Sequence, residues 1–299
     1  MGFKNFWYPK QGGKTYIIAE GGINAAGSVE AAKLMIKQAA SAGVDAIKWQ
    51  KRTPSLAVPE HQKNVIRDTP DGQMTYLEYK EKTEFSIEDC KQLFDYADSL
   101  NLTQSFSVWD FESFIDIIDN FTHRIPWLKI PSCLITNEGL CSNIFEWAYQ
   151  HDKQVIASTG MSTLEEVDQF MRWFNESNAS LDQLVLMHCN SSYPCKTTEL
   201  NLNCIQTLKA RYNLKHVGFS NHDMRVIPTI ASIYKGATFL EVHFTLSREC
   251  WGTDQSSSFE LAGLLNLVNG VRLLEEAEGD GVKQLYNSEL SARKKLRGN

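Results

Sequence analysis

Short apolar runs alternate along the chain with longer amphipathic stretches. Short apolar runs bounded by turn residues are typical of buried strands, and apolar residues that recur at helical spacing are typical of helices. The predicted strands are residues 15–19, 44–50, 102–107, 126–130, 154–158, 184–189, 216–220 and 238–244. The predicted helices are residues 28–42, 86–99, 111–120, 137–150, 163–175, 200–212, 225–235 and 260–276.

This strand–helix alternation predicts a parallel sheet closed into a (β/α)8 barrel, as a single domain over residues 1–299. A doubly wound open sheet is the structural alternative. The glycine-rich stretch AEGGINAAG after the first strand does not have the spacing of a dinucleotide-binding fingerprint. The barrel is therefore the preferred fold.

One long connection, residues 51–85, interrupts the alternation. A segment of this length inside a compact domain is usually functional, so we predict a flap over the active site or a contact with a partner subunit. The segment carries apolar residues expected at the surface, which makes a homodimer through the barrel an expectation.

Polar side chains occupy the C-terminal end of every predicted strand, where barrel enzymes carry their chemistry. In strand order they are Glu20; Lys48 and Gln50; Gln104, Ser105 and Ser107; Lys129 and Ser132; Ser158 and Thr159; His188, Asn190, Ser191 and Tyr193; Ser220, Asn221 and His222; Glu241 and His243. A single polar strand end means little because strand ends meet water. The whole set predicts a site at this end of the barrel.

Two residue types give that site its predicted chemistry. Lys48 and Lys129 are costly to bury without an anion, so with the hydroxyls they predict a phosphate or carboxylate site; for each alone, a lysine extended to the surface is the alternative. His222 and His243 end adjacent strands, and two imidazoles with carboxylate or substrate oxygens suit a divalent transition metal. His188 is open between a site residue and a hydrogen-bonded core histidine.

The composition and charge of the chain argue against two classes of binding partner, nucleic acids and membranes. The formal net charge is −6 and the only basic run is short, so no nucleic acid is expected. No apolar stretch is long enough to span a membrane, so no membrane is expected. The 7 cysteines form no CxxC pair, which predicts reduced thiols in a cytoplasmic protein.

The strand-end motifs together resemble those of the sialic acid synthases, the N-acetylneuraminate synthases with their legionaminate and pseudaminate relatives. The matching stretches are IIAEGGIN (17–24), AGVDAIKWQ (42–50), LKIPS and ITN (within 128–137), ASTGMSTLEEV (157–167), HCNSSYP (188–194), VGFSNH (217–222), GATFLEVHFTLSR (236–248) and WGTDQSSSFE (251–260). They follow one another over nearly the whole chain.

The resemblance implies a synthase that joins phosphoenolpyruvate (PEP) to an aldose for surface polysaccharide biosynthesis. PEP would add to the aldehyde carbon of an open-chain, N-acetylmannosamine-like hexose. Water would add at the enol carbon and phosphate would leave by C–O cleavage. The product would be a nine-carbon 2-keto-3-deoxy sugar acid.

The resemblance also implies a role for each strand-end residue. The catalytic set would be Glu20, Lys48, Lys129, His222 and His243, with Glu20 orienting or deprotonating the attacking water. The PEP carboxylate and phosphate would be held by Lys48, Lys129, Ser132, Ser158, Ser191 and Ser220. The sugar hydroxyls would contact Gln50, Tyr193 and Asp254. His222 and His243 would hold the metal, Mn²⁺ first, with Mg²⁺ or Co²⁺ as alternatives.

The chain departs from the family pattern at several places. Asn221 stands where an aspartate is usual, Leu134 where many members have an acid that touches the amino sugar, and Gln104 where a threonine lies beside the PEP site. The small C-terminal domain of typical members is expected to be absent because the chain ends at Asn299. These departures concern sugar recognition more than PEP, so the acceptor sugar is left open.

Two other functions are kept as alternatives. A synthase of the octulosonate or heptulosonate type would take a phosphorylated aldose, and Lys51 and Arg52 beside Gln50 could bind that phosphate. A barrel that binds ligands without catalysis is the other alternative. The retained lysines, histidines and Glu20 argue against it.

Overall fold

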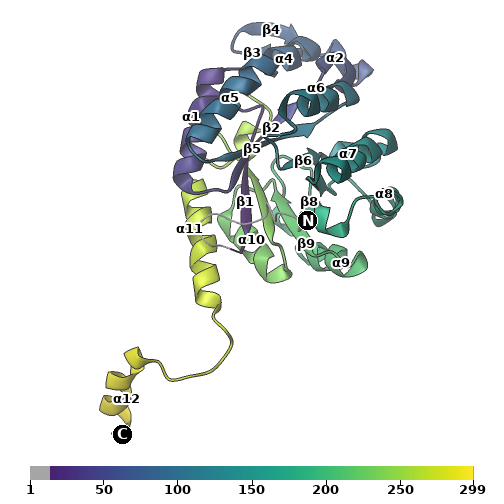
Figure 1. The fold of residues 1–299 in the computed structure, drawn as a ribbon. Coiled ribbons are helices and arrows are strands. Elements are labelled where there is room, and N and C mark those ends of the chain that lie inside the picture. Colours follow the sequence, from purple (N-terminus) through teal and green to yellow (C-terminus); the bar gives the residue numbers. More distant parts are fainter. Residues whose placement is uncertain (1–13, 299) are drawn as a thin grey trace.

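The chain forms a closed parallel barrel surrounded by helices, as the computed structural model of residues 14–298 shows (Figure 1). The barrel strands are β1 Tyr16–Gly22, β2 Ala46–Lys51, β5 Thr103–Val108, β6 Trp127–Ile130, β7 Gln154–Ser158, β8 Leu184–Cys189, β9 His216–Asn221 and β10 Phe239–His243. Their order is β1-β10-β9-β8-β7-β6-β5-β2, closed on itself. The predicted (β/α)8 barrel is confirmed, and the open sheet is wrong.

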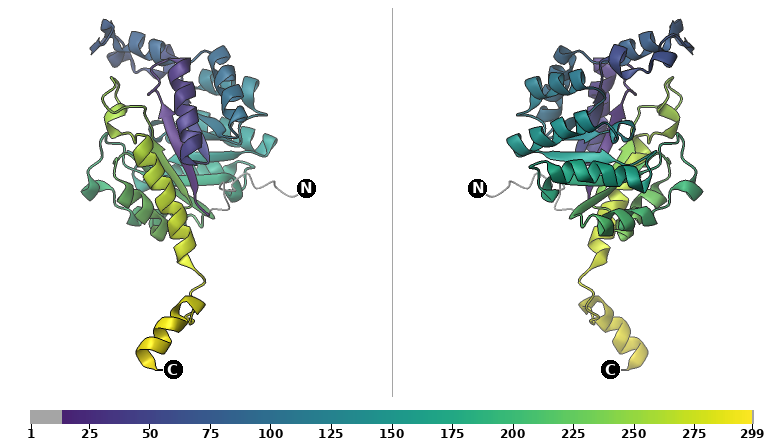
Figure 2. Two further views of the ribbon diagram at one scale, coloured as in Figure 1. Left: turned by 90° about the vertical axis from the view of Figure 1, so that its left-hand side faces the viewer. Right: turned by 90° about the vertical axis from the view of Figure 1, so that its right-hand side faces the viewer.

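Helices follow the strands and cover the outside of the barrel (Figures 1 and 2). They are α1 Val29–Ala42, α5 Ile87–Ser99, α6 Phe111–Phe121, α7 Glu138–His151, α8 Leu164–Glu176, α9 Asn203–Arg211, α10 Val226–Ala231 and α11 Leu261–Glu278. Several begin at side-chain caps that satisfy free backbone N–H groups. Thr163 and Glu166 form a capping box at the start of α8, where the Thr163 N–H donates to the Glu166 carboxylate over 2.7 Å.

Apolar side chains fill two separate spaces. The large cluster lies between the strands and the helices and contains Val217 and Phe219 of β9. A smaller cluster lies inside the barrel and comprises Tyr16, Ile18, Ala46, Trp127, Ile156, Val185, Met187 and Phe239. Because side chains alternate along each strand, the inward positions that follow this inner cluster toward the C-terminal strand ends are free to carry polar groups.

Residues 51–85 fold into small elements of their own. They comprise α2 Pro54–Ala57, α3 Glu60–Lys63, the hairpin of β3 Ile66–Thr69 and β4 Gly72–Thr75, and α4 Tyr76–Thr83. The Tyr79 ring in α4 packs edge-on against Trp251, in the loop after β10, with 4.6 Å between the ring centroids. This contact fixes the segment beside the C-terminal strand ends; its role as a flap or partner contact stays a prediction.

The chain leaves the barrel after α11 and ends in α12 Leu290–Arg297, which stands away from the barrel (Figures 1 and 2). The basic residues Lys294, Lys295 and Arg297 lie in the last turn of α12, where positive charge favours a helix. Within residues 14–298, no helix combines the length and the apolar character that crossing a bilayer requires.

Candidate active site

The C-terminal strand ends surround one cavity of about 230 Å³. Its walls include every residue to which the family resemblance gives a role except Asp254: Glu20, Lys48, Gln50, Lys129, Ser132, Ser158, Ser191, Tyr193, Ser220, His222 and His243. The other wall residues are Ser107, Trp109, Pro131, Cys133, Met161, Cys189 and Glu241. The structure therefore brings together side chains from every barrel strand, as the strand-end pattern predicts.

Four charged side chains, Glu20, Lys48, Lys129 and Glu241, form the pocket floor. Each residue is at most 3% exposed. The Lys48 ammonium makes an ion pair with Glu20 and lies 3.9 Å from Glu241, and the Lys129 ammonium lies 2.6 Å from Glu241. The register places Glu20 beside Lys48 on one side and beside His243 on the other. The buried ions therefore compensate one another: Glu20 and Lys48 lie on the adjacent strands β1 and β2, and Lys129 of β6 reaches Glu241 of β10 across the barrel.

Burial and mutual attraction give the two floor carboxyls opposite pKa shifts. Burial raises the pKa of Glu20, and Lys48 offsets only part of that effect. Burial also acts to raise the pKa of Glu241, but attraction from Lys129 and Lys48 outweighs it and lowers the pKa to about 2. Burial lowers the pKa of the Lys129 ammonium. Glu20 is thus the floor carboxyl better suited to exchange a proton.

Serine hydroxyls line the cavity next to this floor. The Oγ atoms of Ser158 and Ser191 are buried and have no hydrogen-bond partner within the described part of the chain. Ser132 Oγ accepts a hydrogen bond from the Gly160 N–H over 3.1 Å, and Ser220 Oγ donates to Glu241 over 3.3 Å. Unpaired buried hydroxyls are costly unless a ligand supplies their partners. The serines therefore fit a bound anion.

Gly160 allows these serines to approach one another. A methyl group on Gly160 would lie 2.8 Å from Ser132 Oγ and would also collide with Ser191 Oγ. Sequence reasoning did not single out this glycine, although it lies directly after the Ser158–Thr159 strand end. Only glycine leaves the space that both hydroxyls occupy.

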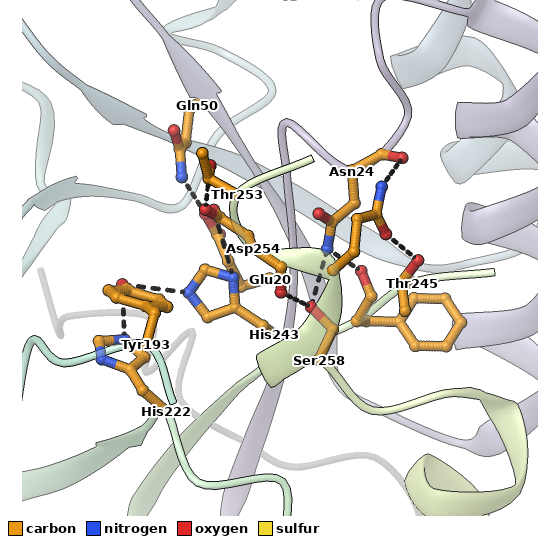
Figure 3. A network of polar contacts seen from close by, with 12 residues as sticks. Glu20, Asn24, Gln50, Tyr193, His222, His243, Thr245, Thr253, Asp254 and Ser258 are labelled. Carbon is orange, nitrogen blue, oxygen red and sulfur yellow. Dashed lines mark hydrogen bonds and ion pairs between the residues drawn. The ribbon is translucent and has the colours of Figure 1, made fainter. Parts of the chain in front are cut away.

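The two predicted metal ligands converge on a tyrosine (Figure 3). The Tyr193 hydroxyl lies 2.9 Å from His222 Nε2 and 3.5 Å from His243 Nε2. Asn190 O lies 2.5 Å from His222 Nδ1, and Asp254 Oδ2 lies 3.7 Å from His243 Nδ1. Asp254 therefore sits behind His243, although it does not line the cavity.

This arrangement fits a divalent transition metal in its donor chemistry. Asn190 O accepts a hydrogen bond from the Nδ1–H of His222, which leaves the ring lone pair on Nε2, the atom beside the Tyr193 hydroxyl; this is the usual support of a metal-bound histidine. Burial lowers the pKa of His243 to about 3, so its ring is neutral. Within residues 14–298, no three His, Cys, Asp or Glu side chains are grouped as metal ligands. The protein would thus supply two nitrogen ligands, and other ligands would come from substrate or water.

The three residues at which the chain departs from the family pattern do not line the cavity. Gln104 does not reach the cavity, which β5 lines with Ser107 instead. Leu134 packs against the outer core and does not line the cavity. Asn221 donates to Thr229 Oγ1 over 2.8 Å and accepts from the Asp223 N–H, so its amide joins β9 to the start of α10.

The structure also places His188 and Lys51 outside the cavity wall. His188 Nε2 lies 2.7 Å from Leu200 O, so this histidine is the hydrogen-bonded core residue. The Lys51 ammonium donates to Phe85 O over 3.0 Å and lies 4.0 Å from Glu84, and it does not line the cavity. Lys51 is therefore not placed to bind an acceptor phosphate in this cavity.

Among the wall residues, Ser107 and Glu241 were named at the predicted strand ends without a role, and Trp109 was missed, although the alternation of the strands carries a signal for all three. Ser105 and Ser107 face inward from β5, because they pair with Lys48 and Gln50 of β2, and Trp109 is the next residue of the same parity. Glu241 lies two residues before His243 on β10 and faces the same way. The two-residue period of a strand therefore places Ser107, Trp109 and Glu241 on the inward face.

Known proteins resemble the chain over most of its length. The model of the NeuB family matches residues 35–283. The N,N'-diacetyllegionaminic acid synthase of Campylobacter jejuni is 32% identical over 283 residues, which cover 92% of this chain and 81% of that protein. The N-acetylneuraminate-9-phosphate synthase of Mus musculus is 30% identical over 294 residues, covering 95% and 77%.

A solved structure agrees with these relatives. The N-acetylneuraminic acid synthetase of Leptospira borgpetersenii, crystallised with citrate, superposes with a TM-score of 0.78 at 27% identity. The match covers 95% of this chain and 93% of that one. The predicted resemblance to sialic acid synthases is confirmed: the chain belongs to the NeuB family and is a synthase of that type.

Proposed function

We propose that the protein condenses PEP with an aldose to give a nine-carbon 2-keto-3-deoxy sugar acid for surface polysaccharide biosynthesis. The observation that supports it best is the cavity at the strand ends, where two buried lysines and unpaired serine hydroxyls face the same space. PEP carries a carboxylate and a phosphate on three carbons, and both need fixed positive donors. Three relatives named as synthases of legionaminic acid, N-acetylneuraminate 9-phosphate and pseudaminic acid point the same way.

The reaction would form one carbon–carbon bond and break one carbon–oxygen bond. C3 of PEP attacks the aldehyde carbon, whose oxygen takes up a proton. A water oxygen adds at C2, and phosphate leaves with the bridging oxygen. Lys48 and Lys129 would hold the PEP anion, with Ser132, Ser158, Ser191 and Ser220 completing the contacts.

Glu20 would orient the attacking water and accept its proton. Its carboxylate lies in the floor and accepts a hydrogen bond from the Gln50 amide over 3.1 Å. Its pKa is raised by burial, which favours proton uptake. Gln50 and Tyr193 would contact the sugar hydroxyls, and Asp254, which does not line the cavity, would hold the His243 ring instead. A divalent metal such as Mn²⁺, held by His222 and His243, would polarise the aldehyde oxygen.

The direct test is phosphate release from PEP with a panel of aldoses, with and without added Mn²⁺. We expect release that requires both an aldose and the metal, and loss of release in His222→Ala with the fold retained by circular dichroism. No release with any aldose would contradict the proposed synthase and favour a binding barrel. Full activity of His222→Ala would remove the metal assignment. The cytoplasmic location and the homodimer stay predictions.

A further inference from the structure

Two strands continue their inward-facing rows beyond the floor toward the mouth of the cavity. On β2 the row runs Lys48, Gln50, Arg52, and on β5 it runs Ser105, Ser107, Trp109. The Trp109 N–H donates to Lys51 O over 3.0 Å, so the pairing of the two chains extends past the strand ends. Arg52 and Trp109 therefore lie about 7 Å nearer the mouth than Gln50 and Ser107.

Arg52 fixes the Trp109 ring in place. The guanidinium carbon lies 4.5 Å from the ring centroid, in the geometry of a cation–π contact. Arg52 is only 4% exposed, and its Nε lies 2.7 Å from the Glu84 carboxylate. It also donates to the Gln50 side-chain oxygen. We refer to Arg52, Glu84 and Trp109 as the rim. One face of the indole is thus covered by a held cation, and the ring lines the cavity.

We propose that Trp109, held by Arg52, is the wall against which the acceptor sugar packs, and that the acceptor group at this wall carries no phosphate. This rests on the proposed condensation, which places PEP at the floor. An aldose whose aldehyde carbon reaches PEP must extend its remaining carbons toward the mouth. There it meets Trp109 with the apolar atoms of Pro131, Cys133 and Met161. Such a wall suits the C–H face of a sugar or an acyl group.

Neither Arg52 nor Lys51 lines the cavity. Arg52 faces Glu84, and Lys51 turns to the same carboxylate and to Phe85 O. Among the described residues that line the cavity, the only lysines are Lys48 and Lys129 of the floor, and there is no arginine. A phosphate beside Trp109 would be desolvated without a cation of its own. The rim therefore selects an uncharged group.

Steady-state kinetics of phosphate release test this with two pairs of acceptors, N-acetylmannosamine and mannose, each with and without a 6-phosphate. We expect the unphosphorylated sugar of the active pair to have the higher kcat/KM. Trp109→Ala should raise the acceptor KM about tenfold while the PEP KM stays within about twofold, because only the acceptor loses an aromatic contact. The acceptor KM of Trp109→Phe should lie between those of the wild type and Trp109→Ala. Arg52→Lys, which loses the planar group, should raise the acceptor KM in the same direction.

Tryptophan fluorescence measured without added metal gives a readout that does not depend on turnover. With PEP present, acceptor binding should change the emission of the wild type and of Trp173→Phe, a control in α8, but should not change that of Trp109→Phe. A higher kcat/KM for a 6-phosphate, or an unchanged acceptor KM in both Trp109 variants, would overturn the inference while leaving the synthase intact. No release with any of these sugars or the wider panel would instead overturn the proposed function, and the inference with it.

Discussion

The floor and the rim of the cavity are built in different ways. The floor consists of four buried charges carried by barrel strands, Glu20, Lys48, Lys129 and Glu241, which pair with one another. The rim depends on residues that the barrel strands do not carry. Glu84 comes from the end of the 51–85 segment, and Arg52 and Trp109 lie just past strand ends. The floor is thus fixed by the fold, and the rim can vary without disturbing it.

This difference separates the two substrates. Burying four ions is expensive, and well-packed apolar residues would often be as stable, so such a network points to chemistry. The floor suits PEP, which every synthase of this kind must bind. The rim has one cation–π contact and one ion pair, and it faces the part of the acceptor that differs between sugars.

The largest effect is expected from removing a floor lysine. Lys129→Met leaves Glu241 buried with a weaker partner at 3.9 Å, so the free energy of unfolding should fall by about 3 kcal/mol. The kcat/KM for PEP should fall by about a thousandfold because a fixed cation is lost. Urea unfolding and phosphate release measure the two effects.

The double variant Lys129→Met with Glu241→Gln separates stability from chemistry. It removes both charges, so most of the lost unfolding free energy should return while activity stays low. Recovery of activity together with stability would show that Lys129 has only a structural role.

A smaller effect on the floor is expected from Gly160→Ala. The added methyl group collides with Ser132 and Ser191, so the PEP KM should rise by about ten- to a hundredfold. Gly139→Ala in α7 is the matched control, since its methyl group would lie 3.8 Å from the nearest neighbouring atom. Equal PEP KM values in the two variants, measured by initial rates, would argue against the serine contacts.

Lys80 tests how the 51–85 segment is held. Burial lowers its pKa to about 8 from the ordinary 10.5, and repulsion from Arg52 adds to this. Below pH 8 the folded protein must keep this ammonium charged and buried, which lowers the free energy of unfolding. Between pH 8 and 10.5 the folded state has lost the proton and the unfolded chain still holds it, so the free energy of unfolding rises with pH and the destabilisation disappears. Lys80→Met should therefore be more stable than the wild type by about 2 kcal/mol at pH 7.

The difference in the free energy of unfolding between Lys80→Met and the wild type should narrow as the pH rises from 8 to 10.5. Urea unfolding of both proteins at neutral and alkaline pH measures it, and a gap that is constant with pH would contradict the burial of the Lys80 charge.

The smallest expected effect concerns the charge balance of the rim. Glu84→Gln removes the carboxylate that faces Arg52 and leaves a free cation near Trp109. The ratio of kcat/KM for the 6-phosphate to that for the free sugar should rise about fivefold. Competition between the two sugars in one assay measures this ratio directly. An unchanged ratio would show that Arg52 lies too far from the acceptor to act on it.

Strand period made the barrel and the floor predictable. All eight barrel strands lie where apolar runs predict them, and those at 154–158 and 184–189 have the predicted bounds. Lys48 and Gln50 share a face because they are two residues apart. Except for Asp254, the residues with predicted roles line one cavity, because parallel strands bring their C-terminal ends to one side of a barrel.

The sequence was less informative where a shift of one residue decides whether a side chain faces the cavity. Gln104 stands where the family has a threonine beside the PEP site, but odd-numbered residues of β5 face inward and Ser107 lines the cavity. Asn221 lies between two inward residues and therefore bonds to α10. A shift of one position turns a side chain to the other face of a strand. The rim could not be found in this way, because the pairing of Arg52 with Glu84 depends on how 51–85 folds.

The bridging oxygen of PEP tests the central claim most directly. PEP labelled with ¹⁸O at the C2–O–P position is turned over with an active aldose, and phosphate and sugar acid are analysed by mass spectrometry. Condensation at the floor with water attack at C2 predicts that the label leaves in phosphate and that the keto oxygen comes from water. Label retained in the sugar acid would mean cleavage of the P–O bond and would contradict the account.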